Sequence, residues 1–540
     1  MSQHIKDLLS DLGLEFSTEE KTLKEYSEDK SIFKIEPQVV IFPKNSEDIK
    51  KLVNLAKDNN YTLTCRAAGT DMSGGPLTDS LLLVLTKYFT NFSIDSQNNT
   101  AIVQPGVYFR DFEKELNKYN LMLPSYPASK ELCALGGMIN NNSGGEKSLK
   151  YGKTDKYVLQ LKVILADGEE YIFERLSLNE VKQKMNLSNF EGEIYRQLYN
   201  LFKDNNELIK KSKPKVSKNS SGYNIWDAFN DEYFDLTKLF VGAQGTLGIV
   251  TEAKLKLVPK DNFSKLAVIF IKDLKNLPLF TNDILSLNPT SLEITDDHTF
   301  KIFMRFAREM ASLLGARGVF STIRLFLPDL MIILKLGIPK LIVLCEFSGD
   351  DEAEIQEKIN KLKLINQKYN FLYRIPTSEI DANKYWRLRR DTYRLLREKI
   401  KHLSAAPFID DFIIQPQYLS EFLPQLYNIL DSYQMIYTIS GHLGDGNLHI
   451  IPLVDFTKKE TRENIVEIME KVHSLVLKYE GILTAEHNDG IIRGPYLAKE
   501  FGTEIFNIFQ TIKNIFDPHN IFNNYKKTKA VKEYILRFMK

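Results

Sequence analysis

Ser440-Gly-His442-Leu-Gly-Asp-Gly-Asn-Leu-His449 is the stretch around which the rest of this sequence is organised. The apolar runs beside it, Tyr437-Thr-Ile and Ile450-Ile-Pro-Leu, are typical of short β-strands. Between them, Gly444-Asp-Gly-Asn447 supplies the residues that a tight turn needs. The stretch therefore predicts a β-hairpin with His442 and His449 on neighbouring strands, close enough to share one ion.

A second motif, Thr484-Ala-Glu486-His487-Asn-Asp-Gly490, follows another apolar run and ends in a glycine turn. It can bring a carboxylate and an imidazole to the same place. We therefore predict a metal site formed by His442, His449 and Glu486, with His487 beside it as a base. The alternative is that the histidines are structural and that the glycines and aspartates are simply good turn residues.

The composition is that of a folded protein with several domains. The chain has 540 residues, enough for two to four domains, and is 43% hydrophobic and 26% charged. Its 71 basic and 70 acidic side chains nearly balance, so the global charge gives no indication of a nucleic-acid partner.

The cysteines and the N-terminus indicate where the protein works. Cys65, Cys133 and Cys345 are scattered, which argues against an iron–sulfur cluster or a disulfide framework and fits a reducing compartment. We find no secretory signal and no apolar run of about 18 residues that could cross a bilayer. The expected location is the cytoplasm.

A glycine-rich loop follows a strand–helix–strand pattern near the N-terminus. Residues 37–66 alternate in this way, and Arg66-Ala-Ala-Gly69-Thr70-Asp-Met-Ser73-Gly74-Gly75 comes next. Glycines, hydroxyls and an arginine after a strand can bind phosphate oxygens. A plain turn is the alternative, and the loop is neither a P-loop nor the nicotinamide fingerprint.

Two further glycine-rich loops follow. Pro127 to Gly145 is rich in small and amide side chains, which allow a flat ligand to approach the backbone closely; a flexible surface loop is the alternative. Leu159–Leu165 is expected to be a strand, with helices from about residue 170 to 212. The third loop spans Gly242 to Thr251 and precedes another strand.

The three loops, together with the two histidine motifs, resemble the family of FAD-linked D-2-hydroxyacid dehydrogenases. This family includes D-lactate dehydrogenase, the glycolate oxidase flavin subunit and D-2-hydroxyglutarate dehydrogenase, and its FAD-binding domain is of the type found in vanillyl-alcohol oxidase and p-cresol methylhydroxylase (PCMH). The resemblance covers roughly residues 20 to 526. Its most specific motifs are Gly69 to Gly75, Gly242 to Thr251, His442 to His449, and Glu486-His487.

The resemblance implies an α+β fold with a PCMH-type FAD-binding domain of two subdomains. An α+β cap domain with an antiparallel sheet would bind the substrate, and C-terminal helices would return to the FAD-binding domain. The expected boundaries are 1–36 for an N-terminal segment, 37–260 for the FAD-binding domain, 261–455 for the cap and 456–540 for the C-terminal segment.

The resemblance also implies which residues bind FAD. The first loop would hold the pyrophosphate, the second the isoalloxazine and ribityl, and the third the adenine side. The expected residues are Arg66, Gly69, Thr70, Ser73, Gly74, Pro127, Ser129, Gly136, Gly137, Asn140, Asn142, Gly145, Gly245 and Ile249. Relatives with covalent flavin carry a histidine in the first loop, and this loop has none, so FAD is expected to bind without a covalent bond.

By the same resemblance, His442, His449 and Glu486 would bind zinc or manganese, which grips the substrate's carboxylate and 2-hydroxyl. His487 would remove the hydroxyl proton while a hydride passes from C2 to flavin N5. In Trp386-Arg-Leu-Arg389, Arg389 would bind the carboxylate as a planar donor. Because the adjacent Arg387 and Arg390 compete for this role, a solvated arginine face is the alternative.

Two departures from the family bear on the substrate. Ile409 stands where some relatives have a substrate-contacting lysine, and Ile451 where D-2-hydroxyglutarate enzymes place an asparagine. Both replacements remove polar contacts, so we expect a monocarboxylate such as D-lactate. The segment Phe516 to Asn524 resembles the family's closing motif, which packs near the flavin.

Residues 301–340 form an unusual insert. Apolar runs are interleaved there with Lys301, Arg305, Arg308, Arg317, Arg324, Lys335 and Lys340, against only Glu309 and Asp329. This pattern suits an element that lies on anionic lipid, as a peripheral contact with the inner face of the membrane. The alternative is a buried elaboration of the cap domain with a basic rim.

The leading hypothesis is an FAD-dependent dehydrogenase of a D-2-hydroxy acid. One alternative is a flavin-dependent transferase of the alkylglycerone-phosphate synthase type, but its histidine motif differs from the one in this sequence. Another is a non-catalytic FAD-binding subunit, which would not need His442, His449, Glu486 and His487. With no nicotinamide fingerprint, the expected electron acceptor is a quinone, a cytochrome, a partner flavoprotein or oxygen.

Overall fold

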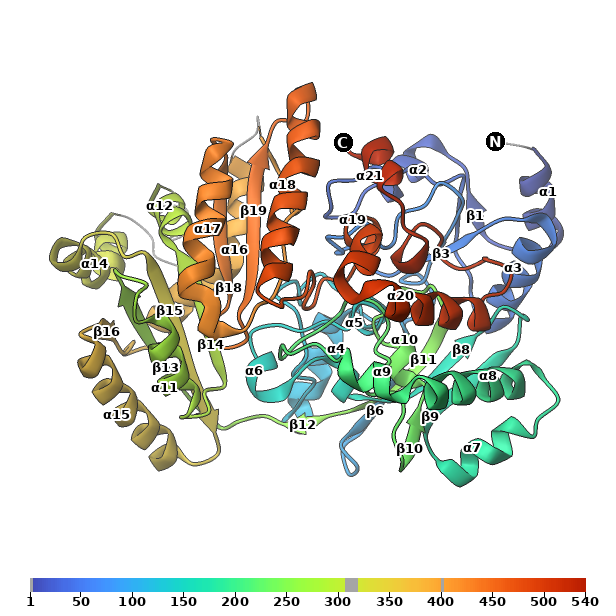
Figure 1. Cartoon of the computed structure of the whole chain (residues 1–540), viewed down its shortest axis with the longest axis horizontal. Coiled ribbons are helices and arrows are strands. Elements are labelled where there is room, and N and C mark those ends of the chain that lie inside the picture. Colours follow the sequence, from blue (N-terminus) through green and yellow to red (C-terminus); the bar gives the residue numbers. More distant parts are fainter. Residues whose placement is uncertain (1–2, 306–318, 400–402) are drawn as a thin grey trace.

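The chain forms two halves that lie side by side (Figure 1). The computed structural model describes residues 3–305, 319–399 and 403–540. One half contains a four-stranded and a six-stranded sheet, and the other is built on a seven-stranded sheet. Helices and mostly antiparallel strands are mixed along the chain, so the expected α+β fold is confirmed.

The four-stranded sheet ends at the first glycine-rich loop. Its order is β1-β2-β4-β3, with bounds Phe16–Ser17, Val39–Ile41, Leu81–Val84 and Leu63–Arg66. Helix α3 (Ser46–Asn59) joins β2 to β3 and begins at Asn45, whose side chain accepts a hydrogen bond from the Asp48 amide. Because β2 and β3 are both parallel to β4, the loop after β3 leaves the end of a buried parallel strand.

The six-stranded sheet corrects one expectation. Its order is β10-β9-β8-β11-β6-β5, with bounds Tyr233–Asp235, Glu170–Ser177, Val158–Ile164, Ile249–Lys256, Thr100–Val103 and Phe92–Asp95. Strand β9 pairs with β8 as a hairpin, so the expectation of helices directly after residue 170 is wrong. The helices begin only at α7 (Leu178–Met185), followed by α8 (Phe190–Asp204) and α9 (Asn206–Lys211).

The seven-stranded sheet is antiparallel throughout and carries the histidine hairpin. Its order is β16-β13-β15-β14-β18-β19-β17, with bounds Leu372–Arg374, Phe263–Ile271, Leu341–Gly349, Ser291–Asp296, Ile436–His442, Asn447–Val454 and Ser404–Ala405. Strands β18 and β19 pair so that Ser440 is opposite His449. The predicted hairpin is therefore confirmed.

Alternate residues of this sheet pack on helices at its two faces. Ala267, Ile269 and Ile271 of β13 share a core with residues of α11 (Leu277–Leu285), α15 (Glu352–Tyr369), α17 (Leu419–Ser432) and α18 (Lys459–Lys478). Leu266, Val268 and Phe270 pack instead against α12 (Asp297–Arg305), α14 (Val319–Leu336) and α16 (Glu379–Lys399). Because successive side chains of a strand point to opposite faces of its sheet, α16 and α17 lie on opposite faces of the seven-stranded sheet.

The chain returns to the first half at its C-terminus, as expected. Apolar side chains of α20 (Leu497–Phe516), including Phe509 and Ile512, join the core that covers the six-stranded sheet. Helix α20 runs beside α8 in Figure 1. Among residues 3–305, 319–399 and 403–540, no helix combines the length and apolar character that crossing a membrane requires.

Candidate active site

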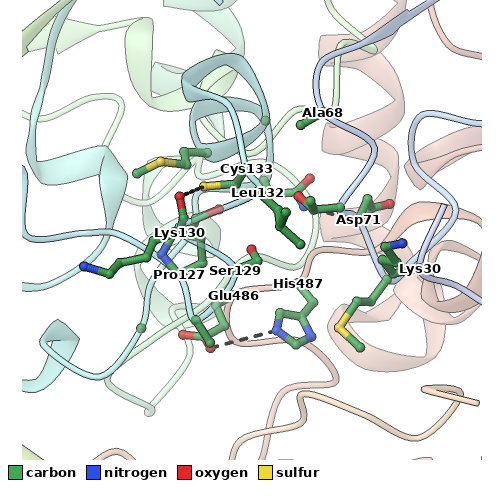
Figure 2. A pocket seen from close by; sticks show the side chains of 18 of the residues that line it. Lys30, Ala68, Asp71, Pro127, Ser129, Lys130, Leu132, Cys133, Glu486 and His487 are labelled. Atoms are coloured by element: carbon green, nitrogen blue, oxygen red, sulfur yellow. Dashed lines mark hydrogen bonds and ion pairs between the residues drawn. The ribbon is translucent and has the colours of Figure 1, made fainter. Parts of the chain in front are cut away.

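A cavity of about 1140 Å³ lies where the two halves meet. Residues of all three glycine-rich loops line it, and so do residues of β18, β19 and α16. Figure 2 shows Ser129 and Asp71 around the same opening as Glu486 and His487. Small-molecule sites usually measure roughly 300–1,000 Å³, so this cavity has room for a dinucleotide and a small substrate together.

Most of the predicted flavin-binding residues line this cavity. They are Gly69, Thr70, Pro127, Ser129, Gly136, Gly137, Asn140, Gly145, Gly245 and Ile249. The wall is rich in glycine and alanine, which leave backbone N–H and C=O groups open to a flat ligand. This chemistry fits the edges of a flavin and the oxygens of a pyrophosphate.

Four of the predicted residues lie behind the wall instead: Arg66, Ser73, Gly74 and Asn142 are not among the lining residues. The Arg66 guanidinium donates to the carbonyls of Tyr26, at 3.1 Å, and Glu28, at 2.7 Å. It therefore fixes the N-terminal segment against the first loop.

An acidic side chain closes the first loop. One Asp71 carboxylate oxygen accepts from the Gly75 amide at 2.6 Å and from the Ser73 hydroxyl at 2.9 Å, and the other accepts from the Asn141 amide group at 3.1 Å. Gly74 has a φ of +83°, a conformation that favours glycine. The loop is thus held in one shape by its own side chains.

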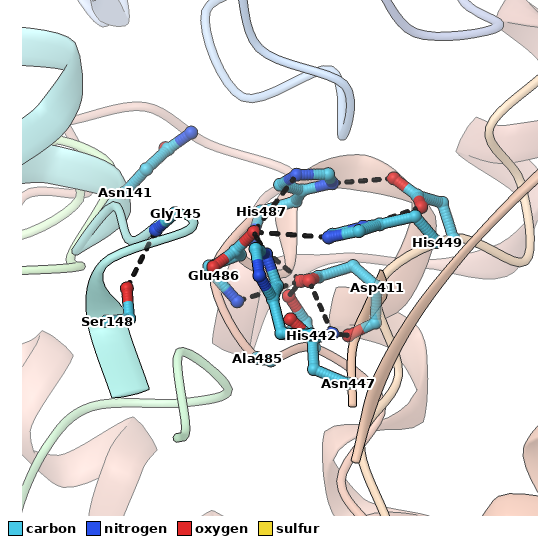
Figure 3. Close-up of polar contacts among 12 residues, drawn as sticks. Asn141, Gly145, Ser148, Asp411, His442, Asn447, His449, Ala485, Glu486 and His487 are labelled. Carbon is cyan, nitrogen blue, oxygen red and sulfur yellow. Dashed lines mark hydrogen bonds and ion pairs between the residues drawn. The ribbon is translucent and has the colours of Figure 1, made fainter. Parts of the chain in front are cut away.

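In the wall of the same cavity, three histidines converge on one oxygen of Glu486 (Figure 3). The Nε2 atoms of His442, His449 and His487 lie 3.0, 3.2 and 4.0 Å from Glu486 Oε1. His442 and His449 come from the hairpin, and Glu486 and His487 from the loop that precedes α19 (Gly490–Arg493). The two sequence motifs, about 40 residues apart, therefore form one cluster.

Each of these imidazoles is fixed from behind by a buried carboxylate. His442 Nδ1 lies 2.7 Å from Glu293 Oε1 on β14. Asp410 serves the other two, with Oδ1 at 3.1 Å from His449 Nδ1 and Oδ2 at 2.6 Å from His487 Nδ1. A carboxylate on Nδ1 sets the tautomer that leaves the Nε2 lone pair free, which is the usual support of a metal-binding histidine.

The donor atoms fit a divalent cation. Single donor atoms of Asp411, His449, Glu486 and His487 lie within 4.8 Å of one another. His442 contacts the same Glu486 oxygen. Imidazole nitrogens mixed with carboxylate oxygens suit zinc or manganese.

The charges of the cluster depend on one another. Burial alone would raise the pKa of Glu486, but His442 and Lys218 hold it well below its usual value. Lys218 Nζ lies 2.9 Å from Asp445 and 3.5 Å from Glu486 Oε2. For His487, burial favours the neutral ring, but Asp410 and Asp411 outweigh it and raise the pKa to about 10.

Sequence reasoning missed the pair Asp410-Asp411, which organises this cluster. One oxygen of Asp411 accepts from the backbone amides of Glu486, at 2.9 Å, and His487, at 2.7 Å, and also from the Thr484 hydroxyl. Asp410 holds the two imidazoles, so the pair fixes both the backbone and the side chains. The sequence feature that could have indicated this pair is two adjacent acidic residues directly before an apolar run.

The predicted arginine also lines the cavity. Arg389 Nε donates to Glu293 Oε2 at 3.0 Å, and Nη1 lies 3.4 Å from the Ser440 hydroxyl. Glu293 thereby connects Arg389 to His442, a link that the sequence did not indicate. Arg387 and Arg390 line the same cavity, and Arg390 is paired with Glu146. Three arginines of α16 therefore line the cavity, of which Arg389 is largely buried and Arg390 is exposed.

Proteins of known structure share this fold. A 4-ethylphenol oxidase from Gulosibacter chungangensis superposes with a TM-score of 0.71 at 16% identity, and the match covers 99% of each chain. For p-cresol methylhydroxylase the TM-score is 0.67 at 14% identity, over 98% of this chain and 95% of the other. The expected PCMH-type fold is confirmed; at these identities the likeness shows the fold alone.

Curated relatives match over nearly the whole chain. D-2-hydroxyglutarate dehydrogenase of Pantoea ananatis is 27% identical over 514 residues, which cover 92% of this chain and 48% of the relative. D-lactate dehydrogenase of Archaeoglobus fulgidus is 25% identical over 495 residues, covering 91% and 92%. The chain thus spans about half the length of the D-2-hydroxyglutarate dehydrogenases that it matches.

Two family models match the two halves. One, described as an FAD binding domain, matches residues 37–173, and the other, described as the C-terminal domain of FAD linked oxidases, matches residues 261–527. The first contains the first two glycine-rich loops that line the cavity, and the second contains every residue of the histidine cluster. The chain therefore belongs to the family of FAD-linked oxidases.

Proposed function

We propose that this protein is an FAD-dependent dehydrogenase that oxidises a D-2-hydroxy acid of the D-lactate type to the 2-oxo acid. The observation that carries this proposal is the convergence of three imidazoles on Glu486 Oε1, in the wall of the same cavity that the FAD-binding loops line. The names of the relatives, D-2-hydroxyglutarate dehydrogenase and D-lactate dehydrogenase, support this substrate class.

The lining residues of the three loops would hold FAD in this cavity. When bound, FAD supplies the acceptor for the hydride that leaves C2 of the substrate. The first loop contains no histidine, so binding is proposed to be non-covalent. Asp71 and Asn141 keep the first and second loops in contact at 3.1 Å and so fix the width of the cofactor site.

His442, His449 and Glu486 would hold the metal, zinc or manganese. A divalent ion at this place lowers the pKa of a coordinated hydroxyl and attracts a carboxylate. Lys218 binds the far oxygen of Glu486, which leaves Oε1 directed at the imidazoles. Glu293 and Asp410 keep the three Nε2 lone pairs directed at the same point.

His487 is the proposed base. Its Nε2 lies farther from Glu486 Oε1, at 4.0 Å, than the other two, so it has room to reach a substrate hydroxyl. Asp410 stabilises the imidazolium that forms when His487 takes the proton. A cation beside Nε2 opposes protonation in the resting site, so metal loading favours the neutral ring that a base needs.

Arg389 would bind the substrate carboxylate. Its side chain is only 10% exposed, and the bond to Glu293 fixes the guanidinium plane next to the cluster. Ile451 lines the cavity as an apolar wall and favours a short monocarboxylate, whereas Ile409 is buried in the cap core and does not line it. Arg387 and Arg390 also line the cavity, and arginines bind carboxylates. The second candidate substrate is therefore a dicarboxylate, D-2-hydroxyglutarate.

The decisive experiment is anaerobic reduction of the bound flavin. Purified protein with FAD is mixed with D-lactate, L-lactate, D-2-hydroxyglutarate and L-2-hydroxyglutarate, and the flavin absorbance is followed. We expect D-lactate to bleach it at least tenfold faster than the others. Faster bleaching by D-2-hydroxyglutarate would identify that acid as the substrate. If no acid in a wider panel of 2-hydroxy acids reduced the flavin, the proposed dehydrogenase activity would be refuted.

Electrons are proposed to leave to an acceptor other than a nicotinamide, because the sequence lacks that fingerprint. A quinone, a cytochrome or a partner flavoprotein would serve. Reoxidation of the bleached flavin by a soluble quinone analogue, by cytochrome c or by an electron-transfer flavoprotein distinguishes these three.

A further inference from the structure

A stripe of exposed apolar side chains runs along the C-terminal part of α14 and just past its end. Leu327, Leu330, Met331, Leu334 and Ile338 are 47%, 45%, 63%, 79% and 46% exposed. Their spacing of three or four residues places the four helical ones on one side of α14. Single exposed apolar residues are ordinary, but five within twelve residues form a patch that marks an interaction surface.

The opposite side of α14 is firmly attached to the cap. Ile332 and Leu336 pack against the apolar cluster that includes Trp386 of α16. Asp329 is buried and accepts hydrogen bonds from Lys384 and Tyr385, also of α16. The orientation of α14 is therefore fixed by its buried side, and the stripe faces outward because the other side is already occupied.

The charge around the stripe is positive. The sequence from 301 to 340 contains seven Lys and Arg residues against two acids, and of the basic ones the structure describes the side chains of Lys301, Lys335 and Lys340. Of these acids, Asp329 is buried and paired, and Glu309 lies in the segment 306–318, outside the described residues. Lys335 is exposed, and Lys301 and Lys340 share the single carboxylate of Asp297.

We propose that this stripe docks on an anionic membrane surface, with α14 lying in the interface. Leucine and methionine on one side, with lysine near them, is the composition of helices that insert an apolar face between lipid headgroups. The net positive charge selects anionic lipid over another apolar protein surface, which would not require it. Helix α14 lies at the outer end of the cap half in Figure 1, and the stripe residues are 45–79% exposed there.

Docking here would place the membrane one helix away from the cavity. Helix α14 holds α16 through Asp329 and Lys384, and α16 carries Arg389 in the cavity wall. The docking itself does not depend on the proposed reaction, because the stripe and its charge are independent of the chemistry in the cavity.

The test is sedimentation of the full chain with vesicles. Vesicles of phosphatidylcholine alone are compared with vesicles that contain 30% phosphatidylglycerol, at low and at high salt. Leu330→Glu/Leu334→Glu is compared with Leu279→Glu/Leu364→Glu, which changes two leucines, 60% and 65% exposed, on other helices. Circular dichroism and bound-flavin absorbance confirm that each variant is folded.

We expect the wild-type chain to sediment with the anionic vesicles only, less so at high salt. The stripe variant should lose at least tenfold in partition coefficient, whereas the control variant should not. Absence of sedimentation, or equal loss in both variants, would overturn the proposal. A wild-type dimer that the stripe variant dissociates, without lipid binding, would also overturn it and assign the stripe to a contact between copies.

Discussion

Asp410 Oδ2 lies 2.6 Å from His487 Nδ1, which makes a buried carboxylate the support of the proposed base. The second oxygen of Asp410 supports His449 in the same way, at 3.1 Å. One side chain therefore sets the tautomer of two imidazoles that point at the same place. A change at this position should therefore affect the proposed metal site and the proposed base together.

Asp410→Asn tests this double role. Asparagine keeps one acceptor oxygen, so one of the two imidazoles must face an N–H group and turn its lone pair away from the cluster. We expect metal affinity to fall roughly 10- to 100-fold, as it does when such supporting carboxylates are removed. Metal content and calorimetric titration measure this, and Asp204→Asn, at an exposed position on α8, is the control. Unchanged metal affinity would contradict the role of Asp410.

Removal of the proposed metal should lower the rate of substrate oxidation without releasing FAD. The proposed donors His442, His449 and Glu486 belong to the histidine hairpin and the loop before α19, whereas the proposed FAD-binding residues belong to the three glycine-rich loops. Dialysis against a strong chelator is therefore expected to lower the rate of flavin bleaching at least a hundredfold while bound FAD stays constant. Added zinc or manganese should restore the rate. Full activity in metal-free protein would refute a metal role.

His487→Asn should remove the base and leave the remaining cluster in place. General-base catalysis contributes roughly 10²- to 10⁴-fold, so the bleaching rate should fall by that factor at saturating substrate. The half-saturating substrate concentration should change far less, because Arg389 and the metal still bind the acid. Stopped-flow spectroscopy separates the two quantities. A loss confined to substrate affinity would show that His487 binds but does not take the proton.

Most of the residues that meet at this cavity could be singled out from the sequence, because they lie in local motifs. Turn residues between apolar runs predict the hairpin and its two histidines. An apolar run followed by a glycine turn likewise predicts the loop that carries Glu486. Asp410 and Glu293 could not be predicted, because their role depends on which strands lie behind the imidazoles. Strand β9 was missed for a similar reason: Gly168, with a φ of +85°, turns the chain into a hairpin that only pairing with β8 reveals.

Asn523 connects the closing motif to the flavin side of the molecule. Its side-chain amide donates to the carbonyls of Gly75, at 3.0 Å, and Gln244, at 2.6 Å, and its oxygen accepts from the Thr64 hydroxyl. Asn523→Ala leaves these buried groups without partners, at roughly 1–3 kcal/mol each. We expect FAD to bind at least tenfold more weakly, measured by flavin fluorescence. Asn524→Ala, which removes only an exposed bond to Asn520, is the control.

Glu500 predicts how stability depends on pH. Burial, with the nearby Asp489, raises the pKa of Glu500 to about 8 in the folded protein, from an ordinary value of 4.5. Because the pKa is raised in the folded protein, the protonated Glu500 makes its full contribution to the free energy of unfolding below about pH 4.5. This contribution is lost as pH rises through about 8. Each pKa unit corresponds to about 1.4 kcal/mol, so the total is of the order of several kcal/mol.

Glu500→Gln keeps an acceptor for the Leu483 amide, which lies 2.6 Å from Oε1, but it cannot ionise. The variant should therefore gain in thermal midpoint relative to the wild-type protein as pH rises from 5 to 8.5, and scanning calorimetry at each pH measures the difference. Glu504→Gln, at an exposed position on the same helix, should show a constant difference. If the Glu500→Gln difference were equally constant, the buried carboxyl would not be titrating in this range, and the loss of stability at high pH would have to come from other groups.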